Sequence, residues 1–194
     1  MQRRESPSQT AGPYIHIGSN PNWVEITGVW DRDLGLVMVT PETRGERILV
    51  EGAVLDGAGV AVTDALVEIW QADSEGRHSA DPSFAGWGRQ PTDPSSGRFR
   101  FETIKPGPLP FDGRRMMAPH ISLWLVARGL NMGLHTRLYF ADHPEQNAQD
   151  PVLARIPAHR RHTLLARRED REGTPRYVFD IRLQGGDETV FFDI

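Results

Sequence analysis

Residues 98–102 read RFRFE, a stretch in which two phenylalanines alternate with three charged side chains. Because successive side chains of a strand point to opposite faces of a sheet, this alternation predicts a strand with one buried face. Other short β patterns, separated by turns rich in glycine and proline, recur on both sides of it. They cover residues 47–54, 65–71, 119–127, 134–140 and 177–183, with a closing strand at residues 190–192.

One helical segment interrupts these strands, at about residues 146–156, and Pro151 limits its regularity. Many short strands joined by turns are typical of two packed sheets. The sequence therefore predicts an all-β fold, an antiparallel β-sandwich with one or two short helices.

The first 45 residues differ from the rest. They begin with small and turn-forming residues and show neither helical nor strand periodicity. A disordered tail is the simplest interpretation, yet residues 14–30 carry too many apolar side chains for a solvated tail. We therefore expect an extended N-terminal arm over residues 1–45 that is ordered against its own core or against a neighbouring subunit.

The composition argues against several classes of protein. The 194 residues carry a formal net charge of −4 and form no basic stripe, which disfavours nucleic acid as a partner. No apolar run approaches the roughly 20 residues of a membrane helix, and no apolar segment follows the N-terminus as in a secretory signal. Cysteine is absent, which excludes disulfides. We expect a cytoplasmic protein with no nucleic-acid and no membrane partner.

Histidines are candidate metal ligands, because imidazole commonly binds transition metals. His159 and His162 lie three residues apart, but the two arginines between them disfavour a bound cation. His135 lies within a predicted strand, where we expect a half-buried structural role. The sequence contains neither the nucleophile elbow of hydrolases nor a phosphate-binding loop.

Several longer motifs resemble those of a known family, the intradiol ring-cleavage dioxygenases. The resemblance runs from about residue 7 to residue 194, and its N- and C-terminal stretches are similar to the α chain of two-chain members. The shared stretches are VEIWQAD (67–73), GRH (76–78), TIKPGPLPF (103–111), MAPHIS (117–122), TRLYF (136–140) and YVFDI (177–181), with SQTAGPY (8–14) and GDETVFFD (186–193) at the ends.

The positions of the family's iron ligands are mostly altered. Catalytic members carry tyrosines where His78 and Leu109 stand, and a His-x-His pair where His120 and Ser122 stand. Leucine has no donor atom, and a serine hydroxyl is a poor ligand for ferric iron. The resemblance therefore implies a chain that binds no metal and has no catalytic residue in its own pocket. We call these four positions the vestigial pocket.

The resemblance also implies a partner and a reaction. The assembled enzyme would be a hetero-oligomer of α–β units, with Fe(III) bound by a homologous β subunit and none by this chain. With O₂ it would cleave 3,4-dihydroxybenzoate between its two hydroxyl-bearing carbons, giving 3-carboxy-cis,cis-muconate. Residues 1–45 would be the arm that contacts the partner subunit, and residues 46–194 the β-sandwich domain.

Four residues of this chain would line the partner's active site: Thr10, Gly12, Pro13 and Arg128, hereafter the rim residues. The Arg128 guanidinium would attract and orient the aromatic carboxylate. Without the resemblance, a surface charge at a strand end would be the simpler interpretation of Arg128. Arg137 is a rival for this role, but its place within a predicted strand favours a structural ion pair.

Two alternatives remain open. One is a metal-free β-sandwich module that binds an aromatic acid at the vestigial pocket and acts alone. The other is an independent enzyme with an altered metal site at His78 and His120, although two imidazoles without a carboxylate or phenolate would hold ferric iron poorly.

Overall fold

The structure is a computed structural model that describes residues 10–12, 14–78, 81–169 and 173–193. Nine strands form one sheet in the order β11-β1-β10-β9-β8-β7-β2-β3, with β4 paired to β1, while β5 and β6 form a separate hairpin. The strands are β1 (Arg47–Leu55), β2 (Leu66–Trp70), β3 (Trp87–Pro91), β4 (Arg98–Ile104), β5 (Leu109–Pro110), β6 (Met116–Met117), β7 (His120–Val126), β8 (Leu134–Phe140), β9 (Leu165–Glu169), β10 (Arg176–Val178) and β11 (Ile181–Arg182).

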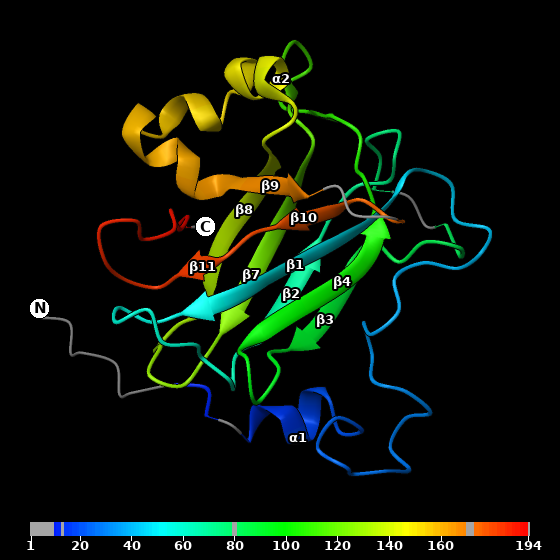
Figure 1. Cartoon of the computed structure of the whole chain (residues 1–194). Coiled ribbons are helices and arrows are strands. Elements are labelled where there is room, and N and C mark those ends of the chain that lie inside the picture. The colour runs from blue at the N-terminus through cyan, green and yellow to red at the C-terminus, as the bar shows by residue number, and fades with distance from the viewer. Residues whose placement is uncertain (1–9, 13, 79–80, 170–172, 194) are drawn as a thin grey trace, which may run out of the picture.

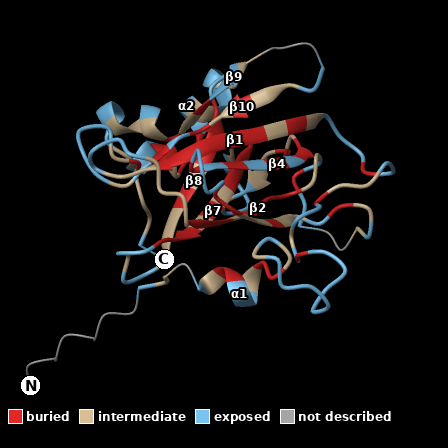
Figure 2. Ribbon diagram, turned by 60° about the horizontal axis from the view of Figure 1, so that its bottom comes forward, coloured by how far each residue is buried: buried red, intermediate tan, exposed pale blue. Residues whose placement is uncertain are grey.

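The large sheet folds over itself, so that β1 and β4 lie across β2, β3 and β7 (Figure 1). The main core fills the space between these layers. Phe99 and Phe101 of β4 are buried in it, whereas the charged residues between them are exposed, as the alternation predicts. Figure 2 shows the same pattern along the strands, where buried segments line the interior. Burying one such aromatic side chain stabilises the fold by about 2–3 kcal/mol.

The predicted β-rich class is confirmed, but the strand pairing is mixed. β1 runs parallel to β10 and β11, and β8 runs parallel to β9, whereas β1–β4, β2–β3, β2–β7 and β7–β8 are antiparallel. Parallel neighbours need a crossover connection. Between β8 and β9 this crossover is made by residues 141–164, which carry α2 (Pro144–Gln149) and the 3₁₀ helices η1 (Leu153–Arg155) and η2 (Ala158–Leu164).

The expected helix at residues 146–156 is therefore shorter and begins earlier. α2 starts with Pro144, whose missing N–H costs nothing at a helix N-terminus. It ends at Gln149, and the following Asp150 is extended because it precedes Pro151. The Asp150 carboxylate then accepts the backbone N–H groups of Val152 and Leu153 at 2.8 and 2.7 Å, which starts the 3₁₀ turn.

Other boundaries also differ from the prediction. Residues 177–183 divide into β10 and β11, and between these strands the Asp180 carboxylate, rather than a backbone carbonyl, accepts the Ala53 N–H of β1 at 2.9 Å. The closing strand at residues 190–192 is reduced to one bridge between Phe192 and His135. β3 and β9 were not expected from the sequence.

The described part of the N-terminal arm packs on the domain. It contains the five-residue helix α1 (Ile15–Ser19), which buries His16. Asp33 is also buried, and its carboxylate accepts the backbone N–H groups of Asn22 and Trp23 at 2.9 and 3.0 Å. Among the described residues, no helix has both the length and the apolar character needed to cross a bilayer.

Candidate functional site

The vestigial pocket lies at one end of the face of β2, β7 and β8 that is turned away from the main core, hereafter the outer face. Ser122 of β7 is the cross-strand partner of Trp70 on β2 and of Arg137 on β8. His120 lies two residues before Ser122, so its side chain points to the same face.

The other two predicted positions reach this region from loops. Leu109 lies on β5, opposite Met117 of β6, and the Met117 sulfur is 3.4 Å from Arg137 Nη1. His78 follows β2 and its ring stacks on Trp70, with the ring centroids 5.8 Å apart. The structure thus gathers all four predicted positions at one end of the outer face.

His120 is buried and already bonded. Its Nδ1 lies 2.8 Å from the Ala118 carbonyl. Burial, together with the nearby charge of Arg137, lowers the pKa of His120 from 6.5 to about 4. The ring is therefore neutral at pH 7, and Nδ1 donates to the carbonyl.

Arg137 fills much of the space beside it. Its Nη1 lies 3.4 Å from both the Met117 sulfur and the Tyr139 hydroxyl, and its guanidinium lies over the Phe192 ring, 5.8 Å from the centroid. The structural ion pair expected for Arg137 is not formed with any described residue. Its partners are a thioether, a phenol and an aromatic ring instead.

The remaining polar groups nearby offer no phenolate and no free carboxylate oxygen as a metal ligand. Burial raises the pKa of Tyr139, so its hydroxyl stays protonated. Both carboxylate oxygens of the buried Asp150 are occupied: Oδ2 accepts the Ala118 N–H at 2.8 Å, and Oδ1 accepts the backbone groups that start η1. No group of three or more histidine, aspartate or glutamate side chains suited to a metal occurs in the described parts of the chain. These residues do not fit a ferric ion.

Three tryptophans surround a cavity of about 200 Å³ next to this pocket on the outer face. Trp70, Trp87 and Trp124 line it together with Ser122 and His135. Its acidic residue, Glu68, is already paired: Arg89 Nε donates to it at 2.7 Å and Trp87 Nε1 at 3.2 Å. The cavity therefore offers flat apolar rings rather than a free charge.

Two of the rim residues, Thr10 and Arg128, lie at the other end of β7, where the chain turns after Val126. Thr10 Oγ1 accepts the Gly129 N–H at 2.7 Å and donates to the Ala127 carbonyl at 3.4 Å. Thr10 is thus hydrogen-bonded to the backbone of both neighbours of Arg128. The Gly12 carbonyl accepts the Ile15 N–H at 3.1 Å, at the entry to α1. Pro13 lies outside the described residues.

Arg128 has a partner that the sequence did not indicate. Its Nη2 lies 3.1 Å from Asp64 Oδ2. The backbone carbonyl of Asp64 accepts Nε2 of His16, at 3.3 Å, and the His16 ring packs against Trp23 with centroids 4.8 Å apart. Neither Asp64 nor His16 carries a local sequence signal for this role, because 48 residues separate His16 from Asp64 and 64 residues separate Asp64 from Arg128.

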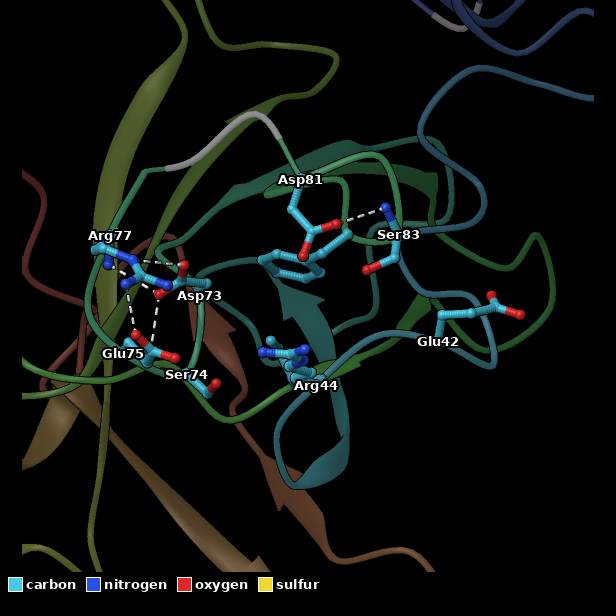
Figure 3. A pocket seen from close by; sticks show the side chains of 10 residues that line it. Glu42, Arg44, Asp73, Ser74, Glu75, Arg77, Asp81 and Ser83 are labelled. Carbon is cyan, nitrogen blue, oxygen red and sulfur yellow. Dashed lines mark hydrogen bonds and ion pairs between the residues drawn. The ribbon is translucent and has the colours of Figure 1, made fainter.

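A second cavity, of about 280 Å³, is lined by side chains of both signs (Figure 3). Arg77 lies 3.4 Å from Asp73 and 2.5 Å from Glu75, and the Asp81 carboxylate accepts the Ser83 N–H at 2.8 Å. Arg44 lies between these two groups of residues. Because its acids already contact an arginine, a hydroxyl or backbone N–H groups, we assign no chemistry to this cavity.

The comparison with known proteins decides the family. A family model described as "Dioxygenase" matches residues 19–185. The chain belongs to this dioxygenase family. It is 43% identical to a protocatechuate 3,4-dioxygenase alpha chain of Pseudomonas putida, over 97% of this chain and 96% of the relative. The family predicted from the motifs is confirmed.

Two further relatives of the dioxygenase family support the assignment. A protocatechuate 3,4-dioxygenase beta chain of Burkholderia cepacia is 39% identical, over 85% of this chain and 76% of its own length. Among solved structures, the dioxygenase domain of a carbohydrate-binding fusion protein from Streptomyces sp. SirexAA-E superposes with a TM-score of 0.60 at 31% identity, covering 75% of this chain and 84% of that one.

Proposed function

We propose that this chain is the iron-free α subunit of a protocatechuate 3,4-dioxygenase. With an iron-carrying β subunit it would catalyse the intradiol, O₂-dependent cleavage of 3,4-dihydroxybenzoate to 3-carboxy-cis,cis-muconate. Full-length similarity to an alpha chain and weaker similarity to a beta chain support a hetero-oligomer of α–β units. Fe(III) would activate the catechol ring in the β subunit, and this chain would hold no metal.

The observation that carries this proposal is the content of the vestigial pocket. Leu109 supplies no donor atom, His120 is bonded to a backbone carbonyl, and Arg137 brings a permanent positive charge. A second cation placed beside a guanidinium is repelled, and more strongly where water is excluded. The chain is therefore equipped to support catalysis elsewhere rather than to perform it in its own pocket.

The rim residues are proposed to line the partner's active site. Thr10 and Gly12 would bring backbone and a small side chain close to the substrate, with Pro13 beside them. Arg128 is exposed on the turn after β7 and would face the substrate carboxylate. A guanidinium presents several N–H donors in a planar fork, which matches the geometry of a carboxylate.

We also propose that residues 1–45 are an arm that contacts the β subunit, and that residues 46–194 form the β-sandwich domain of intradiol dioxygenases in the cytoplasm. The arm exposes a run of large apolar side chains that the domain does not cover. Tyr14, Ile17, Val29, Trp30, Leu34, Leu36 and Val37 belong to this run. Exposed apolar groups of this extent mark interaction surfaces.

The test is to measure protocatechuate-dependent O₂ uptake and iron content for this chain alone and after co-expression with a β chain. We expect iron and activity only when the β chain is present, in proportion to the amount of complex. Stoichiometric iron and ring cleavage by the isolated chain would disprove the proposal.

The tryptophan-lined cavity favours one second candidate, a metal-free module that binds an aromatic acid and acts alone. Aromatic rings stack on flat ligands with little need for charge. Calorimetry of the isolated chain with 3,4-dihydroxybenzoate separates the two. Tight, saturable binding without any β chain would support the binding module. No binding by the isolated chain would favour the α-subunit function instead.

A further inference from the structure

We propose that Asp64 is a positioning residue that orients the Arg128 guanidinium toward the substrate carboxylate. The inference rests on the proposed function, because it assumes that Arg128 faces a carboxylated substrate in the assembled enzyme. It assigns to Asp64 a role in substrate selection that depends on its charge and that acts only through Arg128.

The two side chains of this ion pair differ in their exposure to water. The Asp64 side chain is 14% exposed, whereas that of Arg128 is 69% exposed. Asp64 Oδ2 is shielded from solvent and has no hydrogen bond of good geometry with any described residue. Arg128 Nη2, 3.1 Å away, is therefore the cation that compensates this oxygen. A desolvated carboxylate held by its surroundings can fix one end of a flexible, solvated arginine.

The backbone around both residues is held by the same segment of the arm. His16 Nε2 donates to the Asp64 carbonyl, and Thr10 bridges Ala127 and Gly129 on either side of Arg128. Asp64 and Arg128 are therefore fixed relative to each other although 64 residues separate them. A side-chain contact between two fixed backbone segments restricts the arginine far more than a contact between two mobile loops.

The geometry leaves part of the guanidinium for a ligand. Asp64 contacts Nη2, and the remaining N–H donors of Arg128 can still face a carboxylate. Two effects then oppose each other: Asp64 orients the fork, but its negative charge weakens the attraction of Arg128 for an anion. We expect the orienting effect to prevail, because the water around the exposed guanidinium of Arg128 screens the repulsion between the Asp64 carboxylate and the carboxylate of the ligand.

The experiment uses the assembled enzyme, purified with its β subunit, and compares Asp64→Asn, Arg128→Ala and the double variant. We expect Asp64→Asn to raise KM for 3,4-dihydroxybenzoate by about threefold to tenfold, the loss typical of one charge-assisted contact. The kcat for this substrate and the KM for unsubstituted catechol should stay within about twofold. In the Arg128→Ala background, Asp64→Asn should add nothing.

Two further variants exclude a general loss of structure. Asp64→Glu keeps the charge and should restore much of the selectivity for the carboxylated substrate. Glu51→Gln is the matched control, because Glu51 is a mostly buried acid whose carboxylate lies 3.2 Å from Arg176 Nη1, on β1 and β10. It should leave the ratio of the two KM values unchanged.

Four outcomes would overturn the inference. An unchanged or lowered KM in Asp64→Asn, while Arg128→Ala raises KM selectively for the carboxylated substrate, would refute the role of Asp64 alone. An additive effect in the double variant would show that Asp64 does not act through Arg128. Equal KM effects of Arg128→Ala on both substrates would refute the proposed role of Arg128 and, with it, this inference. An inactive wild-type complex would refute the proposed function and this inference together.

Discussion

Arg137 brings a permanent positive charge within 3.4 Å of the Met117 sulfur and the Tyr139 hydroxyl, inside the vestigial pocket. The replaced ligands explain why donor atoms are missing there. The guanidinium adds a separate obstacle, since it would repel a metal ion even if the donors were restored. At the scale of single residues, the side chains of the pocket thus disfavour a ferric ion in two independent ways.

This leads to a prediction about restored ligands. A chain carrying His78→Tyr, Leu109→Tyr and Ser122→His should still bind Fe(III) poorly, and adding Arg137→Gln should raise its affinity by about tenfold or more. Iron titration followed by metal analysis measures the difference. Arg167→Gln, at an exposed arginine of β9, is the control. Equal iron binding with and without Arg137 would contradict the electrostatic argument.

Lys105, Asp142 and Tyr177 form a compact ionic cluster at the ends of β4, β8 and β10. Lys105 Nζ lies 2.9 Å from Asp142 Oδ2 and 2.6 Å from the Tyr177 hydroxyl, which donates to the same carboxylate at 2.8 Å. Burial acts to raise the pKa of Asp142, but hydrogen bonds from Lys105 and Tyr177 and the lysine charge lower it from 3.8 to about 2.

Lys105→Met should therefore lower the free energy of unfolding near pH 7 by about 1–2 kcal/mol. Because the pKa of Asp142 is lower in the folded chain than in the unfolded one, its contribution is complete above about pH 4 and is lost as the pH falls toward about 2. Urea unfolding at pH 7 and pH 3 should show the wild-type advantage shrinking at pH 3. Arg115→Met, which removes an exposed pair with Asp112, should change stability little at either pH.

At the scale of elements, α1 depends on contacts outside itself. A helix of five residues cannot be stable alone, because nucleation costs more than so few hydrogen bonds return. His16 supplies the missing stabilisation by burying its ring against Trp23 and donating to the Asp64 carbonyl. The element is thus a docking point for the arm rather than a helix formed by local preference.

His16→Ala should release the arm while leaving the sheet intact. Trypsin cleavage at Arg32 should accelerate by about fivefold or more, because cleavage reports the population of the locally opened arm. The far-ultraviolet circular dichroism should stay near that of the wild type. Ile17→Ala changes an exposed residue of the same helix and serves as control. A cleavage rate unaffected by His16→Ala would show that other contacts hold the arm.

At the scale of the whole molecule, apolar surface is distributed unevenly. The domain buries its large side chains between the layers of the sheet, whereas the arm leaves several exposed, Tyr14 to the extent of 81%. Figure 2 shows this contrast between the buried strands and the mostly exposed segment after α1. Such a surface favours association, because water contact with these groups is unfavourable.

The isolated chain should therefore self-associate, and complex formation with a β subunit should suppress this. Replacing Val29 and Trp30 of the arm by serine should reduce self-association severalfold, as measured by light scattering across a concentration series. Met132→Ser is the control, since Met132 is more exposed than Val29 and Trp30 but lies between β7 and β8. An isolated wild-type chain that stays monomeric at all concentrations would contradict the prediction.

The sequence could predict what local chemistry controls. The alternation at Phe99 and Phe101 placed a strand and its buried face correctly. The role that the apolar content of the arm suggests, contact with a neighbouring subunit, stays a prediction. β9 was missed because its residues LARRE show no clear period of two. β3 was missed because WGRQP contains glycine and proline, which are rare in strands.

The sequence by itself determined the family, through its long motifs, and the loss of the family's ligand side chains at Leu109 and Ser122, because the atoms that a side chain carries do not depend on its surroundings. Only the tertiary structure decided that β8 and β9 run parallel, that Arg137 points to Met117 and Tyr139, and that Asp64 holds Arg128. These contacts join segments far apart in the chain, and the packing of the whole sheet sets which of them meet.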